Sequence, residues 1–191
     1  MPSLETVHNL LGRLSQRTQS FGGIGGIPKY TWETIAASMR GIPRGPTSLV
    51  RAVYSLDGTD GKSAIIELML AMEKDQAIQS WKCSKLELTK LCALVVAVRV
   101  RPLLCRRCKG RGHIYPRGAP ARVCDACEGA HRRDIAPREI AKAVGVPSIE
   151  CGKNGKWRKR YLVVTALAEE WIEMAAGRMR KALDERGMVA I

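Results

Sequence analysis

Hydrophobic residues recur along most of the chain at helical spacing, three or four positions apart, which predicts an all-α protein. A capping box formed by Ser84 and Glu87 opens one of these segments, and Thr47 or Ser48 caps a further short helix. A loop is predicted after this short helix at Asp57–Gly61, where glycines and aspartates cluster. The longer helical patterns span Tyr30–Arg40, Ser63–Trp81 and a segment that runs from Ser84 into Arg99.

Two more helical patterns follow in the last third of the chain. The segment Pro137–Ser148 has Ala at its fifth position and Gly145 at its ninth, which is typical of the first helix and turn of a helix-turn-helix. An apolar stripe that begins at Trp157 predicts a long C-terminal helix. Two glycines between Ile149 and Lys156 make a continuous helix unfavourable there, so we expect a basic loop inserted into the turn.

Two Cys-x-x-Cys pairs occupy the middle of the chain. They are Cys105 with Cys108 and Cys124 with Cys127, and 15 residues separate the pairs. This spacing is typical of a zinc ribbon, in which each turn supplies two thiolates and Zn²⁺ takes four ligands in a tetrahedron. A site closed by four sulfurs is structural, because it leaves no coordination position for a substrate. Zn²⁺ is therefore the predicted cofactor.

Other interpretations of the cysteines were weighed. Two disulfides or a redox pair would use the same residues, but the sequence shows no export signal, and a reducing cytosol disfavours disulfides. His113 and His131 flank the pairs and could replace a cysteine, although four cysteines already complete the site. Cys83 and Cys92 are expected to be small buried hydrophobic residues.

These patterns divide the chain into four segments. Residues 1–30 are rich in glycine and are predicted to form a flexible arm, followed by a helical domain over residues 31–104. Residues 105–133 form the predicted zinc-binding module, and residues 134–191 the helix-turn-helix with its long C-terminal helix. The expected fold is thus a helical domain with an inserted four-cysteine zinc ribbon or knuckle.

The distribution of charge predicts a nucleic-acid partner. The chain carries a net charge of +14, and between Arg99 and Arg160 there are 17 Lys or Arg against 5 Asp or Glu, a net charge of +12. Such a concentration around a zinc module favours a polyanion. A membrane is not expected, because no apolar run approaches the roughly 18 residues that a bilayer requires. We expect a protein of the cytoplasm.

The candidate DNA contacts fall into two groups. Basic residues of the zinc module would contact phosphates, which gives affinity and salt dependence without sequence preference. Residues of the inserted loop and of the start of the last helix would read bases, because Arg and Lys pair with guanine and Asn with adenine. The alternative for Arg158–Arg160 is a solvated helix end. The first group is Arg106, Arg107, Lys109, Arg111, Arg132 and Arg133, and the second is Lys153, Asn154, Lys156, Arg158 and Lys159, with Arg160 as a further predicted DNA contact.

Over residues 84–175 the chain resembles the late-gene antitermination (Q) proteins of lambdoid phages. The resemblance is carried by the knuckles Cys105–Gly112 and Cys124–Gly129, by Arg138–Ser148 and by Trp157–Arg160. The first knuckle is also similar to the cysteine-rich region of DnaJ-type chaperones, and the segment after the second is similar to the DNA-binding helix-turn-helix of sigma factors.

The resemblance implies a mechanism that composition and spacing do not give. Such proteins bind double-stranded DNA overlapping a late promoter and load onto the bacterial RNA polymerase holoenzyme, paused with its sigma factor. They then travel with the enzyme and narrow or extend its RNA exit channel, so that terminator hairpins do not form. The compartment implied is the cytoplasm of the bacterial host.

Three other functions were compared with this one. A zinc enzyme would need histidine or a carboxylate among its ligands and a nearby acid–base group, and the sequence has neither, so we expect no enzymatic activity. A chaperone-like, partner-binding module would need more repeats of the knuckle and an apolar groove. An RNA-binding protein that acts on nascent RNA fits the charge equally well. We favour the DNA-binding transcription factor.

Overall fold

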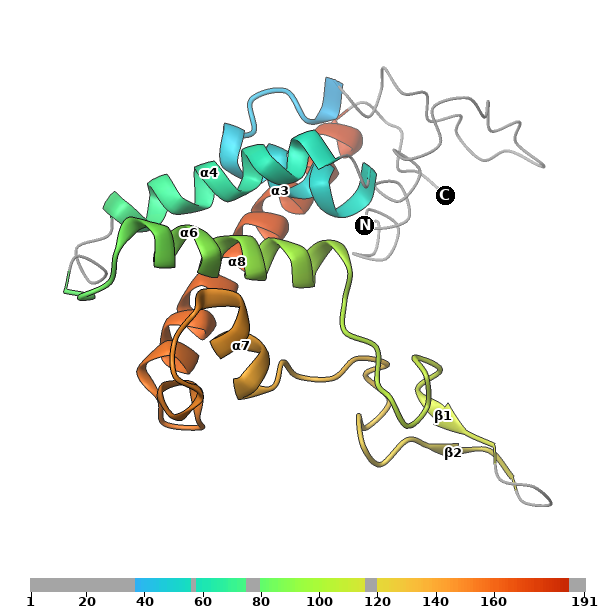
Figure 1. The fold of residues 1–191 in the computed structure, drawn as a ribbon. Helices are drawn as coiled ribbons and strands as arrows, with labels where there is room; N and C mark the ends of the chain where they lie inside the picture. The colour runs from blue at the N-terminus through green and yellow to red at the C-terminus, as the bar shows by residue number, and fades with distance from the viewer. Residues whose placement is uncertain (1–36, 56–57, 75–79, 116–119, 186–191) are drawn as a thin grey trace.

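The computed structural model describes residues 37–55, 58–74, 80–115 and 120–185. This part of the chain is mostly helical, as the sequence predicts, with one two-stranded antiparallel hairpin (Figure 1). The helices are α3 (Arg44–Ser55), α4 (Gly58–Lys74), α6 (Lys85–Val100), α7 (Pro137–Val144) and α8 (Lys156–Asp184), with a 3₁₀ helix, η2, at Ser148–Cys151. The strands are β1 (His113–Ile114) and β2 (Arg122–Val123).

The helices on both sides of the cysteine module share one hydrophobic core. A single cluster of buried residues extends from Leu49 in α3 through Leu91 in α6 and Ile140 in α7 to Trp171 in α8. Helix α8, with 29 residues, contacts α3, α4, α6 and α7. Helix α8 packs across helices from residues 31–104 and from residues 134–191. These two predicted segments therefore contribute to one core and do not form two separate ones.

The predicted helix ends around the module are confirmed. Helix α6 begins at the capping box, where the Glu87 N–H donates to Ser84 Oγ at 3.2 Å and the Ser84 N–H donates to Glu87 Oε2 at 2.7 Å. Helix α7 ends at Gly145, whose backbone lies in the left-handed region with φ 88° and ψ 36°. The Gly145 N–H donates to the Ala141 carbonyl at 2.8 Å, which closes the last turn.

Some predicted boundaries are wrong. The segment Gly58–Gly61, predicted within a loop, is the first turn of α4. Asp60 in this turn pairs with Arg51 of α3, with Nε to Oδ2 at 3.2 Å, and an acidic residue there also complements the helix dipole. Trp81 lies outside any helix rather than ending α4.

Other predictions lie outside the described residues. These are the N-terminal arm, residues 1–30, and most of the helix expected over Tyr30–Arg40. Within the described ranges, no helix is both long enough and apolar enough to cross a membrane.

The cysteine module projects from the helical body between α6 and α7, with the hairpin at its far end (Figure 1). The two segments that connect it to the helices pair with each other at its base. Leu104 and Arg132 form an antiparallel bridge, and the Cys105 N–H donates to the His131 carbonyl at 3.0 Å. The Arg133 N–H donates to the Leu103 carbonyl at 2.8 Å. The module therefore has a narrow, paired base rather than two independent linkers.

Replacing Gly145 with Ala should destabilise the protein by about 1–2 kcal/mol, because an L-residue is strained at this positive φ. The matched control is Gly177→Ala in α8, where an added Cβ meets nothing within 4 Å and helix propensity favours alanine by up to about 1 kcal/mol. Urea unfolding of both variants measures the difference. A Gly145→Ala protein as stable as the Gly177→Ala control would contradict the left-handed turn.

Candidate metal centre and nucleic-acid interface

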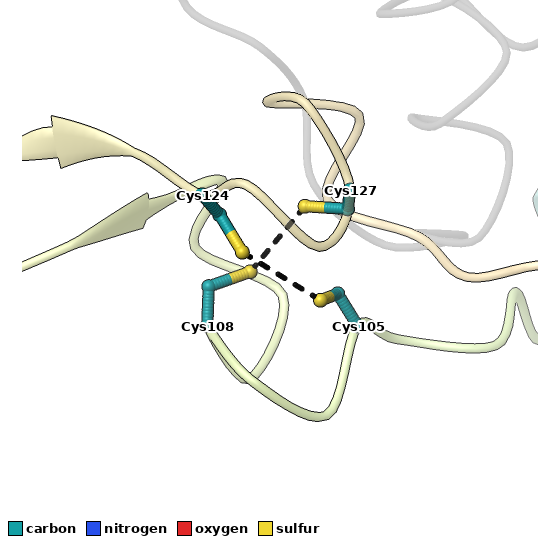
Figure 2. Close-up of side chains that lie close together, drawn as sticks. All are labelled: Cys105, Cys108, Cys124 and Cys127. Atoms are coloured by element: carbon teal, nitrogen blue, oxygen red, sulfur yellow. Dashed lines mark hydrogen bonds between the residues drawn. The ribbon is translucent and has the colours of Figure 1, made fainter.

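Four cysteines from two separate turns meet at one point in the module. Figure 2 shows their sulfurs directed toward one another, with Cys105 close to Cys124 and Cys108 close to Cys127. The Sγ–Sγ distances of these pairs are 3.9 Å and 3.7 Å. All four sulfurs lie within 4.8 Å of one another, so the group could hold a metal ion. The sequence prediction of the four ligands is consistent with this geometry.

The sulfur separations fit a tetrahedral metal ion rather than disulfides. Each of the seven cysteines of the chain is a free thiol. A tetrahedron with metal–sulfur distances of about 2.3 Å has sulfur–sulfur edges of about 3.8 Å, whereas a disulfide bond is about 2 Å long. A tetrahedral set of four sulfurs suits zinc or iron. Cys83, Cys92 and Cys151 lie outside this cluster.

The two knuckles have the same backbone conformation. In each knuckle the residues four, five and seven positions after the first cysteine have positive φ. In the first knuckle these are Lys109 (52°), Gly110 (80°) and Gly112 (74°). In the second they are Glu128 (49°), Gly129 (82°) and His131 (64°). The sequence does not show this equivalence directly, because a histidine replaces glycine at the last position.

Left-handed turns direct backbone N–H groups toward the sulfurs. The Gly112 N–H donates to Cys108 Sγ at 3.3 Å, and the backbone of His131 makes the corresponding hydrogen bond to the thiol of Cys127. Such bonds orient a thiolate and stabilise its negative charge. The His131 ring packs on Gly112, and a Cβ added to Gly112 would lie 2.6 Å from Cε1 of that ring. The Nδ1 atom of His131 lies 3.1 Å from the Gly110 carbonyl oxygen. His131 thus connects the two knuckles.

The surroundings of the sulfurs shift the pKa values of Cys108 and Cys127 in opposite directions. Burial opposes ionisation of Cys108, but hydrogen bonds from the Gly112 backbone and from the neighbouring thiols outweigh it and lower the pKa of Cys108 to about 6. Burial, together with the neighbouring sulfurs, raises the pKa of Cys127 to about 12. Without a cation, Cys108 therefore loses its proton more readily than an ordinary cysteine, and Cys127 less readily. A divalent metal ion would favour the thiolate form of both.

The described residues of the module form almost no apolar core. The buried hydrophobic residues among them are Cys105, Cys108 and Cys124, and of the residues that the structure describes only Ile114 and Cys127 pack against these as partly buried residues. So small a cluster cannot offset the entropy of ordering the chain, so a structure of this kind depends on a metal or another cross-link.

Most of the predicted phosphate contacts surround the metal centre and reach solvent. The side chains of Arg106, Lys109, Arg111 and Arg132 are exposed, and Arg107 is exposed but pairs with Asp125 of the second knuckle, with Nη1 to Oδ2 at 2.8 Å. In the second predicted group, Lys153, Asn154 and Lys159 are exposed. Lys156 is also exposed and pairs with Glu150, with Nζ to Oε1 at 3.0 Å.

Three predicted DNA contacts are partly or fully buried against intramolecular partners. Arg133 binds the Glu139 carboxylate, and Arg158 binds the segment before α7. Arg160 is only 8% exposed, and its guanidinium carbon lies 4.5 Å from the ring centre of Trp157 and 5.3 Å from that of Trp81. We therefore remove Arg160 from the DNA contacts, because a buried guanidinium between two indoles does not face a groove. A basic run in a sequence does not distinguish such residues from exposed ones.

Replacing Cys105 with Ser should abolish stoichiometric metal binding and unfold the module, because metal binding supplies its folding free energy. Elemental analysis of the purified chain gives the metal content, and loss of amide dispersion for residues 104–133 in NMR spectra reports the unfolding. The matched control is Cys83→Ser, outside the cluster, which should retain its metal. Full metal content in Cys105→Ser would contradict the ligand set.

Comparisons with known proteins add no further assignment. No family model, curated protein or solved structure matches the chain. The four-sulfur centre and the basic residues around it are therefore the features of the structure that bear on function.

Proposed function

We propose that the four cysteines bind Zn²⁺ as a structural ion and that the protein is a DNA-binding transcription factor. The observation that carries the proposal is the set of exposed basic side chains on the first knuckle of a module organised by a four-sulfur centre. A closed site of this kind offers no coordination position for chemistry on a substrate, so its role is to hold a surface. An exposed basic surface of this kind suits the phosphate backbone of nucleic acid.

Three cations on the first knuckle are free to bind phosphates. Arg106, Lys109 and Arg111 are exposed, and none makes an ion pair with a residue that the structure describes. The second knuckle carries the acidic residues Asp125 and Glu128 at the positions equivalent to Arg106 and Lys109. Because like charges repel, the first knuckle is the side of the module that would face the DNA backbone.

The elements after the module support a second contact surface. Helix α7, the left-handed Gly145 and the start of α8 have the order of a helix-turn-helix, with η2 and a short turn as an insertion. In such a motif the N-terminal part of the second helix enters the major groove. Exposed Lys153, Asn154 and Lys159 at this end can hydrogen-bond to base edges, and these three remain the candidates for base reading.

The more specific role follows from the resemblance rather than from the geometry. Similarity of both knuckles, Arg138–Ser148 and Trp157–Arg160 to the Q proteins supports a phage antitermination factor that modifies host RNA polymerase. Promoter DNA and the holoenzyme with its sigma factor would then be the partners. Such a protein catalyses no reaction of its own.

Lys109→Gln should reduce the slope of log K against log salt for duplex DNA by about 1, because it removes one phosphate contact. The matched control is Lys62→Gln on α4, which removes the same charge from an exposed position outside the proposed interface and should leave the slope unchanged. Fluorescence anisotropy with random-sequence duplex DNA measures both, and single-stranded RNA of the same sequence is the comparison. Equal slopes for the two variants, or tighter binding to RNA, would contradict the DNA interface.

The protein should increase readthrough of a terminator by bacterial RNA polymerase holoenzyme on templates that carry its DNA element near the promoter. The element is first selected from random duplex DNA by the full chain, and transcription in vitro then compares templates with and without it. Equal readthrough on both templates would exclude loading through DNA. No readthrough on either would exclude antitermination while leaving DNA binding intact.

A further inference from the structure

Two arginines that the sequence suggested as DNA contacts hold residues 133–136, the segment that connects the module to α7, against the helices. Arg133, at the base of the module, forms a bidentate pair with Glu139 of α7, with Nη1 to Oε2 at 2.8 Å and Nη2 to Oε1 at 2.7 Å. The same Oε2 accepts the Ala136 N–H at 2.8 Å, so one carboxylate joins the module to the start of α7.

Arg158 of α8 holds the same segment. It lies in the first turns of α8, and its Nη1 donates to the Ile135 carbonyl at 2.8 Å. Its Nη2 lies 3.3 Å from Asp134 Oδ2, and the side chain is only 19% exposed. The guanidinium carbon is 5.9 Å from the ring centre of Tyr161, one helical turn further along. Residues 133–136 are therefore held by both α7 and α8.

We propose that Arg133 and Arg158 are positioning residues that fix the orientation of the cysteine module relative to α7 and α8. The proposal rests on the proposed function and deepens it, since it lets the basic surface of the module and the loop before α8 engage the same duplex. We call the contacts of Arg133 with Glu139 and of Arg158 with Asp134 and Ile135 the bracket.

Polar contacts add directional restraints to the apolar contacts that Leu103 and Ile135 make with the helical core at the base of the module. The cysteine cluster is separate from the helical core, while Ile135, in the strand that the bracket holds, is buried in that core. A bidentate arginine–carboxylate pair fixes direction as well as distance, and partial burial protects it from salt. Arg133 together with the Ala136 N–H lowers the pKa of Glu139 to about 2, so this carboxylate is ionised throughout the neutral range.

A rigid orientation has a measurable consequence for binding. Two surfaces held at the correct separation bind as one, because the second contact is intramolecular once the first has formed. Releasing the bracket removes this advantage even when every cation is retained. A purely electrostatic account predicts the opposite, because neutralising an acidic residue increases the positive charge of the protein.

The test is the double variant Asp134→Asn/Glu139→Gln in the full, zinc-loaded chain. It retains both arginines and makes the protein more positive by two charges, and glutamine can still accept the capping N–H of Ala136. The matched control is Asp125→Asn/Glu128→Gln, which adds the same two charges to the module outside the bracket. We expect the bracket variant to bind random-sequence duplex DNA at least about ten-fold more weakly than the wild type, and the control to bind as tightly or more tightly.

A second readout does not depend on DNA. Residual dipolar couplings of backbone amides in the module and in the helices should fit one alignment tensor in the wild type and in the control, but two in the bracket variant. The proposal is overturned if the bracket variant binds as tightly as the control, or if its couplings still fit one tensor. A wild type that does not bind duplex DNA would instead overturn the proposed function, and the couplings alone would then decide whether the bracket fixes the module.

Discussion

The arrangement of four sulfurs around one point is the constraint on which the rest of the module depends. The described residues between Leu104 and Arg133, 104–115 and 120–133, bury almost no apolar side chains other than the cysteines themselves. Burial and the neighbouring sulfurs raise the pKa of Cys127 to about 12, whereas hydrogen bonds to Cys108 outweigh its burial and lower its pKa to about 6. A dication bound by all four sulfurs would be the main source of stability of the module.

The conformation of the knuckles determines which side chains of the module are exposed on its surface. Each turn contains left-handed residues, and in the first knuckle the Gly112 N–H reaches the Cys108 sulfur. The exposed positions of the first knuckle are basic, while those of the second are acidic or neutral. The two knuckles of the module therefore differ in charge. The side formed by the first knuckle is suited to a phosphate backbone, and the side formed by the second is not. The base of the module, through Arg133 and Arg158, sets the direction in which that side faces.

Local patterns in the sequence predict several local features correctly, although not every helix boundary. The spacing of Cys105, Cys108, Cys124 and Cys127 predicts the cluster, because ligand geometry limits how far apart the turns can be. The capping box at Ser84 and the left-handed Gly145 were also predictable, since each depends on residues within four positions.

Contacts between distant residues were not predictable in this way. The guanidinium of Arg158 binds the Ile135 carbonyl 23 residues away, and that of Arg160 lies over the ring of Trp81, which is far away in the chain and outside any helix. Within a basic run, nothing in the period or the composition shows which arginine meets a carboxylate, which one stacks on an indole and which one stays in solvent. That choice depends on packing of α7 and α8 against the strand that returns from the module.

X-ray absorption at the zinc edge, on the full chain purified with its metal, tests the central claim most directly. The account predicts a single shell of four sulfur ligands at about 2.3 Å from the ion. Nitrogen or oxygen atoms in that shell, or purified protein with no zinc to measure, would contradict it.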